Sequence, residues 1–479
     1  MAFYHGISTS QQSTSVSTPV VAASGIPFVV GTAPAHTVGG KINEIILVNT
    51  YAEALEALGY SDDWDTYTLC EMIYSQFKLY ECAPVLFVNV LDTSKHTKAI
   101  TATAITIENG QAKLPVDYLI NSVVATADAG GTTTYIKDTD YTVFYDDDNL
   151  ILEVIEGGTI TGTTVYVAAT AIDATKVTKA DIIGGYDVTT EKTKGLELIE
   201  SCFAKYKITP DLILAPGWSY DSEVAAIMQA KASGINDLFA AKALIDVDSK
   251  TIKNYRNVVE WKNNNNITKK EQFLFWPMVT LGGRIFHMST QMAGVIAKTD
   301  SSNGDCPSAS PSNKEMQIDG LCTADGKEIL LDITQANYLN ANGIATSINF
   351  IGGFKSWGNE SAAFPSSTDV KDYFICVSRT FDWVAKTAIQ TFWSKLDGKM
   401  NRRLIDNVVD TFNIYLNGLV SEEKILGGRI ECISEENSLT DLMGGKIKFH
   451  VYLTPPSPAE EMEFIFEYDT SYIQSALSL

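Results

Sequence analysis

Ile26-Pro-Phe-Val-Val-Gly31 is a short apolar run that ends at a glycine, the pattern of a strand buried on both faces. Two similar runs follow at 44–48 and 84–90. Between them the sequence predicts two helices, one capped by Asn49-Thr50 and stopped by Gly59, and one over 66–79. Alternation of strands and helices predicts a sheet covered by helices, so this part of the chain is expected to be mixed α/β.

The same rhythm returns after about residue 187. Asp211-Leu-Ile-Leu-Ala215 is another buried-strand pattern, and a helix is expected before it over 191–206. The elements expected next are a helix over 222–232, a strand over 238–245, a helix over 251–262 and a strand over 272–276. The two α/β stretches therefore form one core domain, interrupted between them.

The interruption is the segment 98–183, which has no Trp, Cys, Met, His or Arg and is dense in threonine. The runs 141–145 and 150–154 flank Asp146-Asp-Asp-Asn149 and predict a β-hairpin. We expect a small inserted β-sandwich or barrel. The aspartate run is a candidate calcium loop, but EF-hand spacing is absent and hairpin tips commonly carry Asp and Asn.

The last third, from about residue 344, is expected to be α+β. Two helical stripes come first, one made of Val377, Phe381, Val384, Ala385, Ala388, Ile389 and Phe392, the other of Leu404, Ile405, Val408, Val409, Phe412 and Leu416. Two alternating strands follow. Ile447, Phe449, Val451 and Leu453 share one face of the first, and Met462, Phe464, Phe466 and Tyr468 share one face of the second.

Both chain ends have the character of arms. Residues 1–18 are mainly Ser, Thr and Gln, with little to bury, so the segment is either a floppy tail or an arm that is ordered against a partner. The final strand is strongly amphipathic and needs a sheet to pair with. Its own sheet can supply that partner, or it can add to the sheet of a neighbouring copy, which is β-augmentation.

Composition excludes several classes of protein. The 479 residues carry 36 basic and 58 acidic side chains, a net charge of −22, which does not suit non-specific binding to nucleic acid or to an anionic membrane surface. The start of the chain does not have the pattern of a secretory signal, and no run is long enough to span a membrane, so we expect a soluble protein that is made and folded in a cytoplasm. Seven scattered cysteines argue against a disulfide framework or a zinc site.

The sequence offers little chemistry. There is no P-loop, no Gly-x-Gly-x-x-Gly after a strand and no Gly-x-Ser-x-Gly elbow. None of the five histidines stands three or four residues from another. We therefore expect a protein that is not an enzyme, with no catalytic residues, no metal site and no cofactor.

Several motifs nevertheless resemble the contractile tail sheath proteins of phage tails and R-type bacteriocins. The motifs are Asp372-Tyr-Phe-Ile-Cys-Val-Ser-Arg379 with Phe381-Asp382; Ile430-Glu-Cys-Ile433 with Glu436-Asn437, Leu442 and Gly444-Gly445-Lys446; Thr454-Pro-Pro-Ser-Pro-Ala-Glu460 with Phe464-Ile-Phe466; Gly25 to Ala33; Asp211 to Gly217; and the inserted hairpins with Asp140-Tyr-Thr-Val143. No single motif is diagnostic, but their order and spacing cover nearly the whole chain.

The resemblance implies a subunit that stacks in six-fold rings around a tail tube in a stretched, higher-energy state. A baseplate trigger then starts a contraction that drives the tube through a target envelope. The implied partners are further copies of the chain, the tube protein, and baseplate and sheath-terminating proteins, in a virion tail or an extracellular tail-like particle. The implied division is an arm over 1–18, a core over 19–97 and 184–343, an outward β domain over 98–183, a tube-facing domain over 344–460, and a C-terminal arm over 461–479.

Charge is unevenly distributed along this division. The segment 98–183 has a net charge of −7, whereas 386–403 has a net charge of +4. If a helix runs through Gly398, then Lys395, Lys399, Arg402 and Arg403 lie on one side, and we expect them to touch an acidic surface of the tube. The alternative is an ordinary solvated run of charges.

Two other functions stay open at this point. One is a non-contractile tail or shell protein built on the same arms. The other is a tail-associated glycan-binding protein or hydrolase, with the β insert as its binding module. The sequence does not distinguish a phage from a headless bacteriocin or another injection machine.

Overall fold

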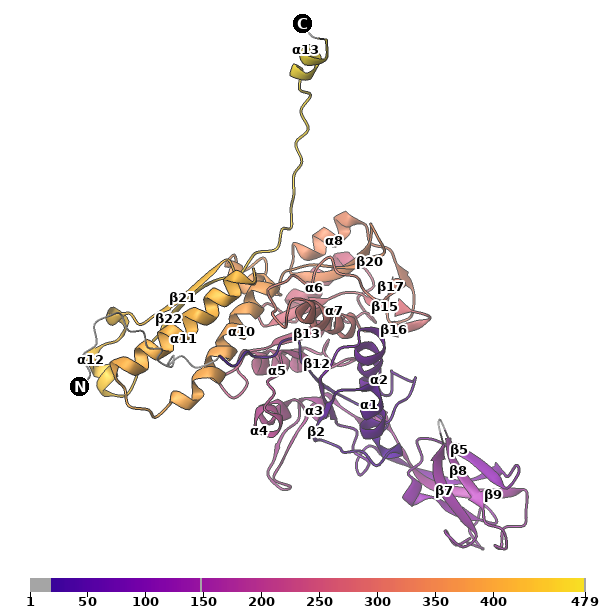
Figure 1. Ribbon diagram of the computed structural model, residues 1–479. Coiled ribbons are helices and arrows are strands. Elements are labelled where there is room, and N and C mark those ends of the chain that lie inside the picture. Colours follow the sequence, from indigo (N-terminus) through magenta and orange to yellow (C-terminus); the bar gives the residue numbers. More distant parts are fainter. Residues whose placement is uncertain (1–18, 147–148, 478–479) are drawn as a thin grey trace, which may run out of the picture.

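A computed structural model describes residues 19–146 and 149–477, and its centre is an eight-stranded mixed sheet (Figure 1). The strand order is β2 (Ile45–Val48), β3 (Val85–Asn89), β1 (Pro27–Gly31), β12 (Leu212–Leu214), β13 (Lys242–Asp246), β14 (Gln272–Phe275), β19 (Ile344–Asn349) and β20 (Phe354–Trp357). All neighbours pair in parallel except the two edge pairs, β2 with β3 and β19 with β20. The predicted mixed α/β fold is confirmed.

Helices cover both faces of this sheet. One face carries α1 (Tyr51–Leu58), α2 (Thr68–Tyr74) and α7 (Met288–Ser302), and the other carries α3 (Lys179–Ile183), α4 (Cys202–Tyr206), α5 (Ser222–Ser233), α6 (Tyr255–Asn264) and α8 (Ile333–Asn340). The predicted cap is confirmed, since the Thr50 hydroxyl accepts a hydrogen bond from the backbone N–H of Glu53. The helix expected over 191–206 is wrong in extent, because β11 (Lys192–Lys194) and a 3₁₀ turn (Gly195–Ser201) precede α4.

The insert folds as two small antiparallel sheets around their own apolar core. One sheet has the order β4 (Thr97–Thr106), β9 (Thr164–Ile172), β6 (Val124–Thr126), and the other has β5 (Gln111–Pro115), β8 (Asn149–Val154), β7 (Tyr141–Asp146). The predicted hairpin is present as β7 and β8, although residues 147–148 of the aspartate run lie outside the described residues. The expected boundary at 183 is wrong, because Val177 and Ile182 are buried in the core of the main sheet.

The C-terminal part is built on two long helices, α10 (Ile375–Phe392) and α11 (Arg402–Ser421), as the two stripes predicted. A two-stranded ribbon of β21 (Gly427–Glu431) and β22 (His450–Thr454) packs on α11, and α12 (Leu439–Met443) lies between the two strands in sequence. The expected start of this part at 344 is wrong, because β19 pairs with β14 inside the main sheet.

The chain beyond residue 460 leaves the body altogether (Figure 1). It runs extended and exposed to α13 (Ser471–Leu477), a helix that the sequence analysis did not predict. The predicted strand with Met462, Phe464, Phe466 and Tyr468 is extended but pairs with no strand of the described chain. The N-terminal arm expected over 1–18 lies outside the described residues.

Candidate functional site

One face of α10 fastens the segment just after the N-terminal 18 residues. The Trp383 indole N–H donates to the carbonyl of Ala22 (2.7 Å), whose own N–H donates to the hydroxyl of Thr387 (3.2 Å). The N–H of Val20 donates in turn to the Thr391 hydroxyl (3.0 Å). Positions four apart share one helix face, so the segment runs antiparallel along α10, and its earliest described residues lie at the C-terminal end of that helix.

The same face continues into a buried ion pair. Arg379, which is 4% exposed, donates to both carboxylate oxygens of Asp300 on α7, with the Nη1–Oδ1 distance at 3.0 Å. The Ser24 hydroxyl donates to Asp300 (2.6 Å) and accepts from Arg379 (3.4 Å). Burial lowers the pKa of Arg379, but the charge of Asp300 and the hydrogen bond to it outweigh burial and raise the pKa, so the guanidinium stays charged.

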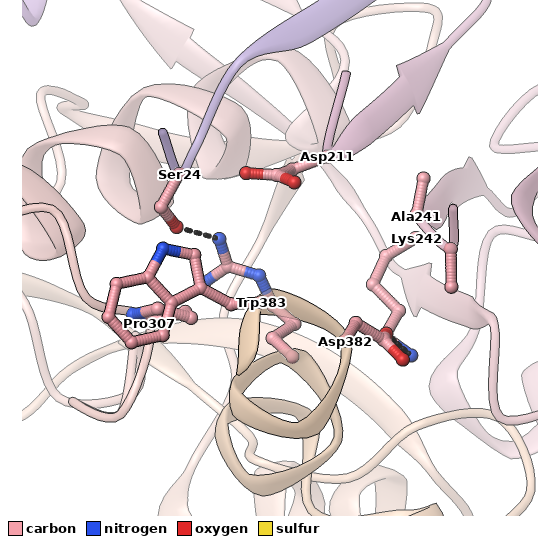
Figure 2. Close-up of a pocket in the computed structure, with 9 residues that line it drawn as sticks. Ser24, Asp211, Ala241, Lys242, Pro307, Asp382 and Trp383 are labelled. Carbon is pink, nitrogen blue, oxygen red and sulfur yellow. Dashed lines mark hydrogen bonds and ion pairs between the residues drawn. The ribbon is translucent and has the colours of Figure 1, made fainter. Parts of the chain in front are cut away.

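Two buried lysines add further links between α10 and the central strands. Lys242 on β13 lies 3.0 Å from the Asp382 carboxylate and donates to the Ser378 hydroxyl (2.7 Å), and Lys386 pairs with Asp211 just before β12. Figure 2 shows Asp211, Lys242 and Asp382, together with Ser24 and Trp383, around a cavity of about 10 Å³, which is about the space of one water. The cluster therefore holds two parts of the molecule together and leaves no room for a substrate.

Sequence analysis identified Arg379 and Asp382 through the family motif but not their partners. Asp300 and Lys242 lie far from α10 in sequence, and neither stands in a recognisable pattern. The one available signal was a set of charged residues inside a helix that also carries an apolar stripe.

A second functional feature is the open edge of the β21–β22 ribbon. Ile430 of β21 exchanges both of its backbone hydrogen bonds with the amide of Asn413 on α11 (3.0 and 3.1 Å), so its N–H and C=O point away from β22. Val451, which stands opposite Ile430, must then point its own N–H and C=O outward on the far side of the ribbon. Within the described chain nothing hydrogen-bonds these outward groups of Val451 and Leu453.

Side-chain burial at this edge points the same way. Phe449 and Leu453 pack partly into the core under α11, but Val451, between them on the same face, is 37% exposed. The apolar face of the ribbon is therefore partly exposed to solvent at its β22 edge, where a third strand would lie.

The predicted arm residues have the matching character. Met462, Phe464, Phe466 and Tyr468 are all at least 74% exposed. Glu460, at the base of this segment, accepts a hydrogen bond from the side-chain amide of Asn359 (2.8 Å). It also lies beside the buried carboxyl of Glu360. Burial and the charge of Glu460 together raise the pKa of Glu360 to about 8.

The four predicted basic residues do not lie along one helix: Lys395 ends a 3₁₀ turn after α10, Lys399 lies in the loop that follows, and Arg402 and Arg403 begin α11. This stretch, 395–403, is called the basic loop below. A 3₁₀ turn (Trp393–Lys395) ends the first helix, Asp397 takes a left-handed φ of 60°, and Asn401 caps the second helix through Leu404 N–H. The condition that a helix runs through Gly398 is therefore not met. Lys399, Arg402 and Arg403 are exposed and Lys395 is half-buried in this loop, together with exposed Trp393 and Leu396.

Other parts of the described chain add no catalytic constellation. No group of three or more His, Cys, Asp or Glu side chains is arranged for a metal ion among the described residues, and no described helix is both long and apolar enough to cross a bilayer. All seven cysteines are free, and five of them are buried. The most buried acid–imidazole contact is that of Glu71 with His287 (2.7 Å), which links α2 to α7.

Comparison with solved structures identifies the fold. The sheath complex of an extracellular contractile injection system, PVC, in its contracted state aligns over 98% of this chain and 99% of its own, with a TM-score of 0.57 and 13% identity. The helical sheath of the anti-feeding prophage in its contracted state aligns over 98% and 100%, with a TM-score of 0.55 and 12% identity. A sheath tail protein of Desulfitobacterium hafniense aligns over 89% and 93%, with a TM-score of 0.52 and 11% identity. The fold is that of contractile sheath subunits.

Sequence comparison finds similar proteins along nearly the whole chain. The tail sheath protein of Burkholderia phage BcepMu is 25% identical over 484 residues, 98% of each chain, and a prophage major tail sheath protein of Pseudomonas aeruginosa strain UCBPP-PA14 is 25% identical over 66% of this chain and 79% of its own. No family model matches the chain. The full-length similarity confirms the resemblance found in the sequence: over nearly its whole length the chain is similar to contractile tail sheath proteins.

Proposed function

We propose that this protein polymerises as stacked hexameric rings around a tail tube, in a metastable extended state, and contracts to drive the tube through a target cell envelope. Its relatives are structural sheath proteins, and its fold neighbours include a contracted sheath. The observation that carries the proposal is that this chain has both an open strand edge, on β22, and an extended amphipathic segment, 462–468, that pairs with no strand.

The C-terminal segment of one copy adds to the open edge of β22 in another. Its alternation puts Met462, Phe464, Phe466 and Tyr468 on one face, where they would cover Val451 and extend the core under α11. The opposite face, with Glu461, Glu463 and Glu467, would lie on the side of the ribbon that carries Arg429 and His450. Charge and apolar pattern therefore agree on the same orientation of the added strand.

The N-terminal segment would also link one copy to another. Because α10 holds residues 20–24 along its length, Val20 lies at the end of α10 nearest the basic loop. We propose that residues 1–18 form a second arm to a neighbouring copy. Each subunit is then linked to others at two fixed points while its rigid body is free to move.

The rest of the molecule faces the other partners. The loop with Lys395, Lys399, Arg402 and Arg403 would contact an acidic surface of the tube, and the acidic insert would face outward. Baseplate and sheath-terminating proteins would contact the two ends of the assembly, which would be made in the bacterial host cytoplasm. It would end in a virion tail or an extracellular tail-like particle.

Contraction requires two packings of nearly rigid subunits that differ by a few kcal/mol in free energy. Linked copies sum this small difference into mechanical work, so neither a nucleotide nor any other cofactor is required by the proposal. Neither catalysis nor binding of nucleic acid is part of it.

Truncation tests the arm. Deleting residues 461–479, or residues 1–18, should leave a folded monomer that forms no sheath, seen by electron microscopy of the purified protein. A finer variant changes one face only: Phe464→Asp with Phe466→Asp should abolish polymerisation, whereas Glu463→Gln with Glu467→Gln on the opposite face should retain it. Normal sheaths from either deletion contradict the proposal, and a single lattice under every trigger would indicate a non-contractile protein.

A further inference from the structure

The helix at the end of the C-terminal arm, α13, exposes an apolar face. It is joined to the body only through the extended segment before it (Figure 1). Tyr472, Ile473 and Leu477 are 75%, 43% and 63% exposed. Ile473 and Leu477 are four residues apart, so they share one face of the helix and form an apolar surface that nothing in its own described chain covers.

A matching apolar pair stands at one end of the acceptor ribbon. Leu439 and Met443 of α12 are also four residues apart, and they are 74% and 81% exposed. The position of α12 is fixed beside the start of β22, since Asn437 hydrogen-bonds the backbone N–H and C=O of Lys448 (2.7 and 3.0 Å) and Glu436 pairs with His450 (2.9 Å). Figure 1 shows α12 at the end of the ribbon remote from the main sheet.

Strand direction decides which end of β22 the helix reaches. Five residues of β22 span about 17 Å, and the roughly ten residues before α13 span about 33 Å, so the arm extends past the strand to which it adds. An antiparallel arm carries α13 to the His450 end, next to α12. A parallel arm carries it to the Thr454 end, where Leu426 donates its N–H to Thr454.

Charge favours the antiparallel direction. The residues just before α13 include exposed Glu467 and Asp469, and the chain between α12 and β22 carries exposed Lys446 and Lys448. The acids at that end already have partners within the chain: Glu436 pairs with His450, and Asp441 and Glu435 accept hydrogen bonds from Ser438 and Ser434. The antiparallel arrangement brings the acidic residues of the arm and these lysines to the same end of the ribbon, which favours one direction of docking over the other.

From this geometry we infer that α13 of one copy docks on the Leu439–Met443 face of α12 in a second copy, by way of an arm that adds antiparallel to β22. The inference rests on the proposed function and adds to it a direction for the arm and a second anchor. The strand then provides backbone hydrogen bonds, and the helix fixes the register at which it stops.

Cysteine cross-linking between copies tests the direction. In a Cys432→Ser background, assembled mixtures of the Met443→Cys and Ile473→Cys variants should give a disulfide-linked dimer on mild oxidation. The matched control mixes Leu426→Cys, at the opposite end of the ribbon, with Ile473→Cys, and should give little dimer. Dimers from the Leu426 mixture in excess of those from the Met443 mixture overturn the inference, as does the absence of both in assembled sheaths.

Assembly thermodynamics tests the anchor. Deleting 471–479, or replacing Met443→Ser, should raise the protein concentration needed for sheath formation about tenfold, since an apolar contact is lost. Leu330→Ser, equally exposed at 79% but outside the ribbon, should change nothing. If the concentration needed for sheath formation is unchanged in both the α12 and the α13 variants, α13 does not dock on α12. If deleting all of 461–479 still abolishes assembly in that case, the arm proposal stands; if it does not, both proposals fail.

Discussion

Arg379 and Asp300 form a buried, bidentate ion pair, with their side chains 4% and 1% exposed. The pair joins α10, the first long helix of the C-terminal part, to α7 on the main sheet, and Ser24 hydrogen-bonds to both members. Three stretches of chain that are distant in sequence therefore meet at one charged contact. The pair therefore fixes the C-terminal part and the segment around Ser24 to the main sheet.

Removing one partner of this pair should be costly. Arg379→Met leaves Asp300 buried without its counter-ion and should lower the free energy of unfolding by about 3–5 kcal/mol in chemical unfolding. Arg402→Met, at an arginine whose side chain is 88% exposed, should cost no more than about 1 kcal/mol. Adding Asp300→Leu to Arg379→Met should restore much of the loss; a double variant no better than the single one would contradict this account.

The N-terminal fastening can be loosened without unfolding the helix. Trp383→Phe keeps a large ring but removes the indole N–H that donates to Ala22, at a cost of about 1 kcal/mol. Limited proteolysis should then cut within 19–24 faster than in the wild type. Trp393→Phe, near the end of the same helix and 58% exposed, is the control, and equal cleavage rates in the two variants would argue against the fastening.

His287 should make stability depend on pH in the alkaline range. Burial lowers its pKa, but the charge of Glu71 and the hydrogen bond to it outweigh burial and raise the pKa from 6.5 to about 9. The folded state therefore binds this proton more tightly than the unfolded state. Its stabilisation is complete below about pH 6.5 and is lost as the pH rises through 9.

Replacing His287→Gln should thus remove a fall of a few kcal/mol in unfolding free energy across this window. Unfolding curves recorded at intervals from pH 6 to 10 measure the effect. His450→Gln, whose ion pair with Glu436 is exposed, should leave the profile as it is. A wild-type profile that stays flat through pH 9 would rule out the protonated pair.

Glu360 should act at the base of the C-terminal arm. Its pKa is raised to about 8 by burial and by Glu460, so it keeps a proton in the folded state that the unfolded state releases at lower pH. The stabilisation is present below about pH 4.5 and disappears as the pH rises to 8. Glu360→Gln should flatten this part of the profile, and Glu460→Gln should narrow it, because it removes the neighbouring negative charge.

The basic loop should grip the tube through charge. Reversing Lys395, Lys399, Arg402 and Arg403 to Glu should weaken binding of the sheath to purified tubes at low salt, with the difference shrinking as salt rises. The control applies the same charge change to exposed lysines elsewhere, namely Lys113, Lys192, Lys250 and Lys327. Unchanged co-sedimentation of the four loop reversals would show the loop to be an ordinary solvated surface.

The strands of the main sheet were predictable from sequence because they are short apolar runs bounded by glycine or proline, as in Ile26–Gly31. The hairpin of β7 and β8 was predictable from its aspartate-rich turn. The start of the C-terminal part was not, because β19 reads as the beginning of a new region although it pairs with β14. Pairing between distant strands leaves no local signal in the sequence.

The buried polar face of α10 could not be predicted from the sequence either. The predicted stripe included Ala385, which is exposed, whereas Arg379, Lys386 and Thr387 on the polar side are buried. A periodicity argument assigns polar side chains to solvent, and here their partners come from strands and loops far along the chain. The arm residues stay a prediction from alternation alone, and in the described chain their segment is extended, exposed and unpaired.

The chain enters and leaves the insert at one place. Thr97 on β4 is the direct neighbour of Ile172 on β9, so the chain enters and leaves the small domain side by side. A short turn across these two residues would close the gap and leave the strands of the main sheet in place. The insert can thus be removed, or replaced by another small domain, without changing the order of the strands in the main sheet.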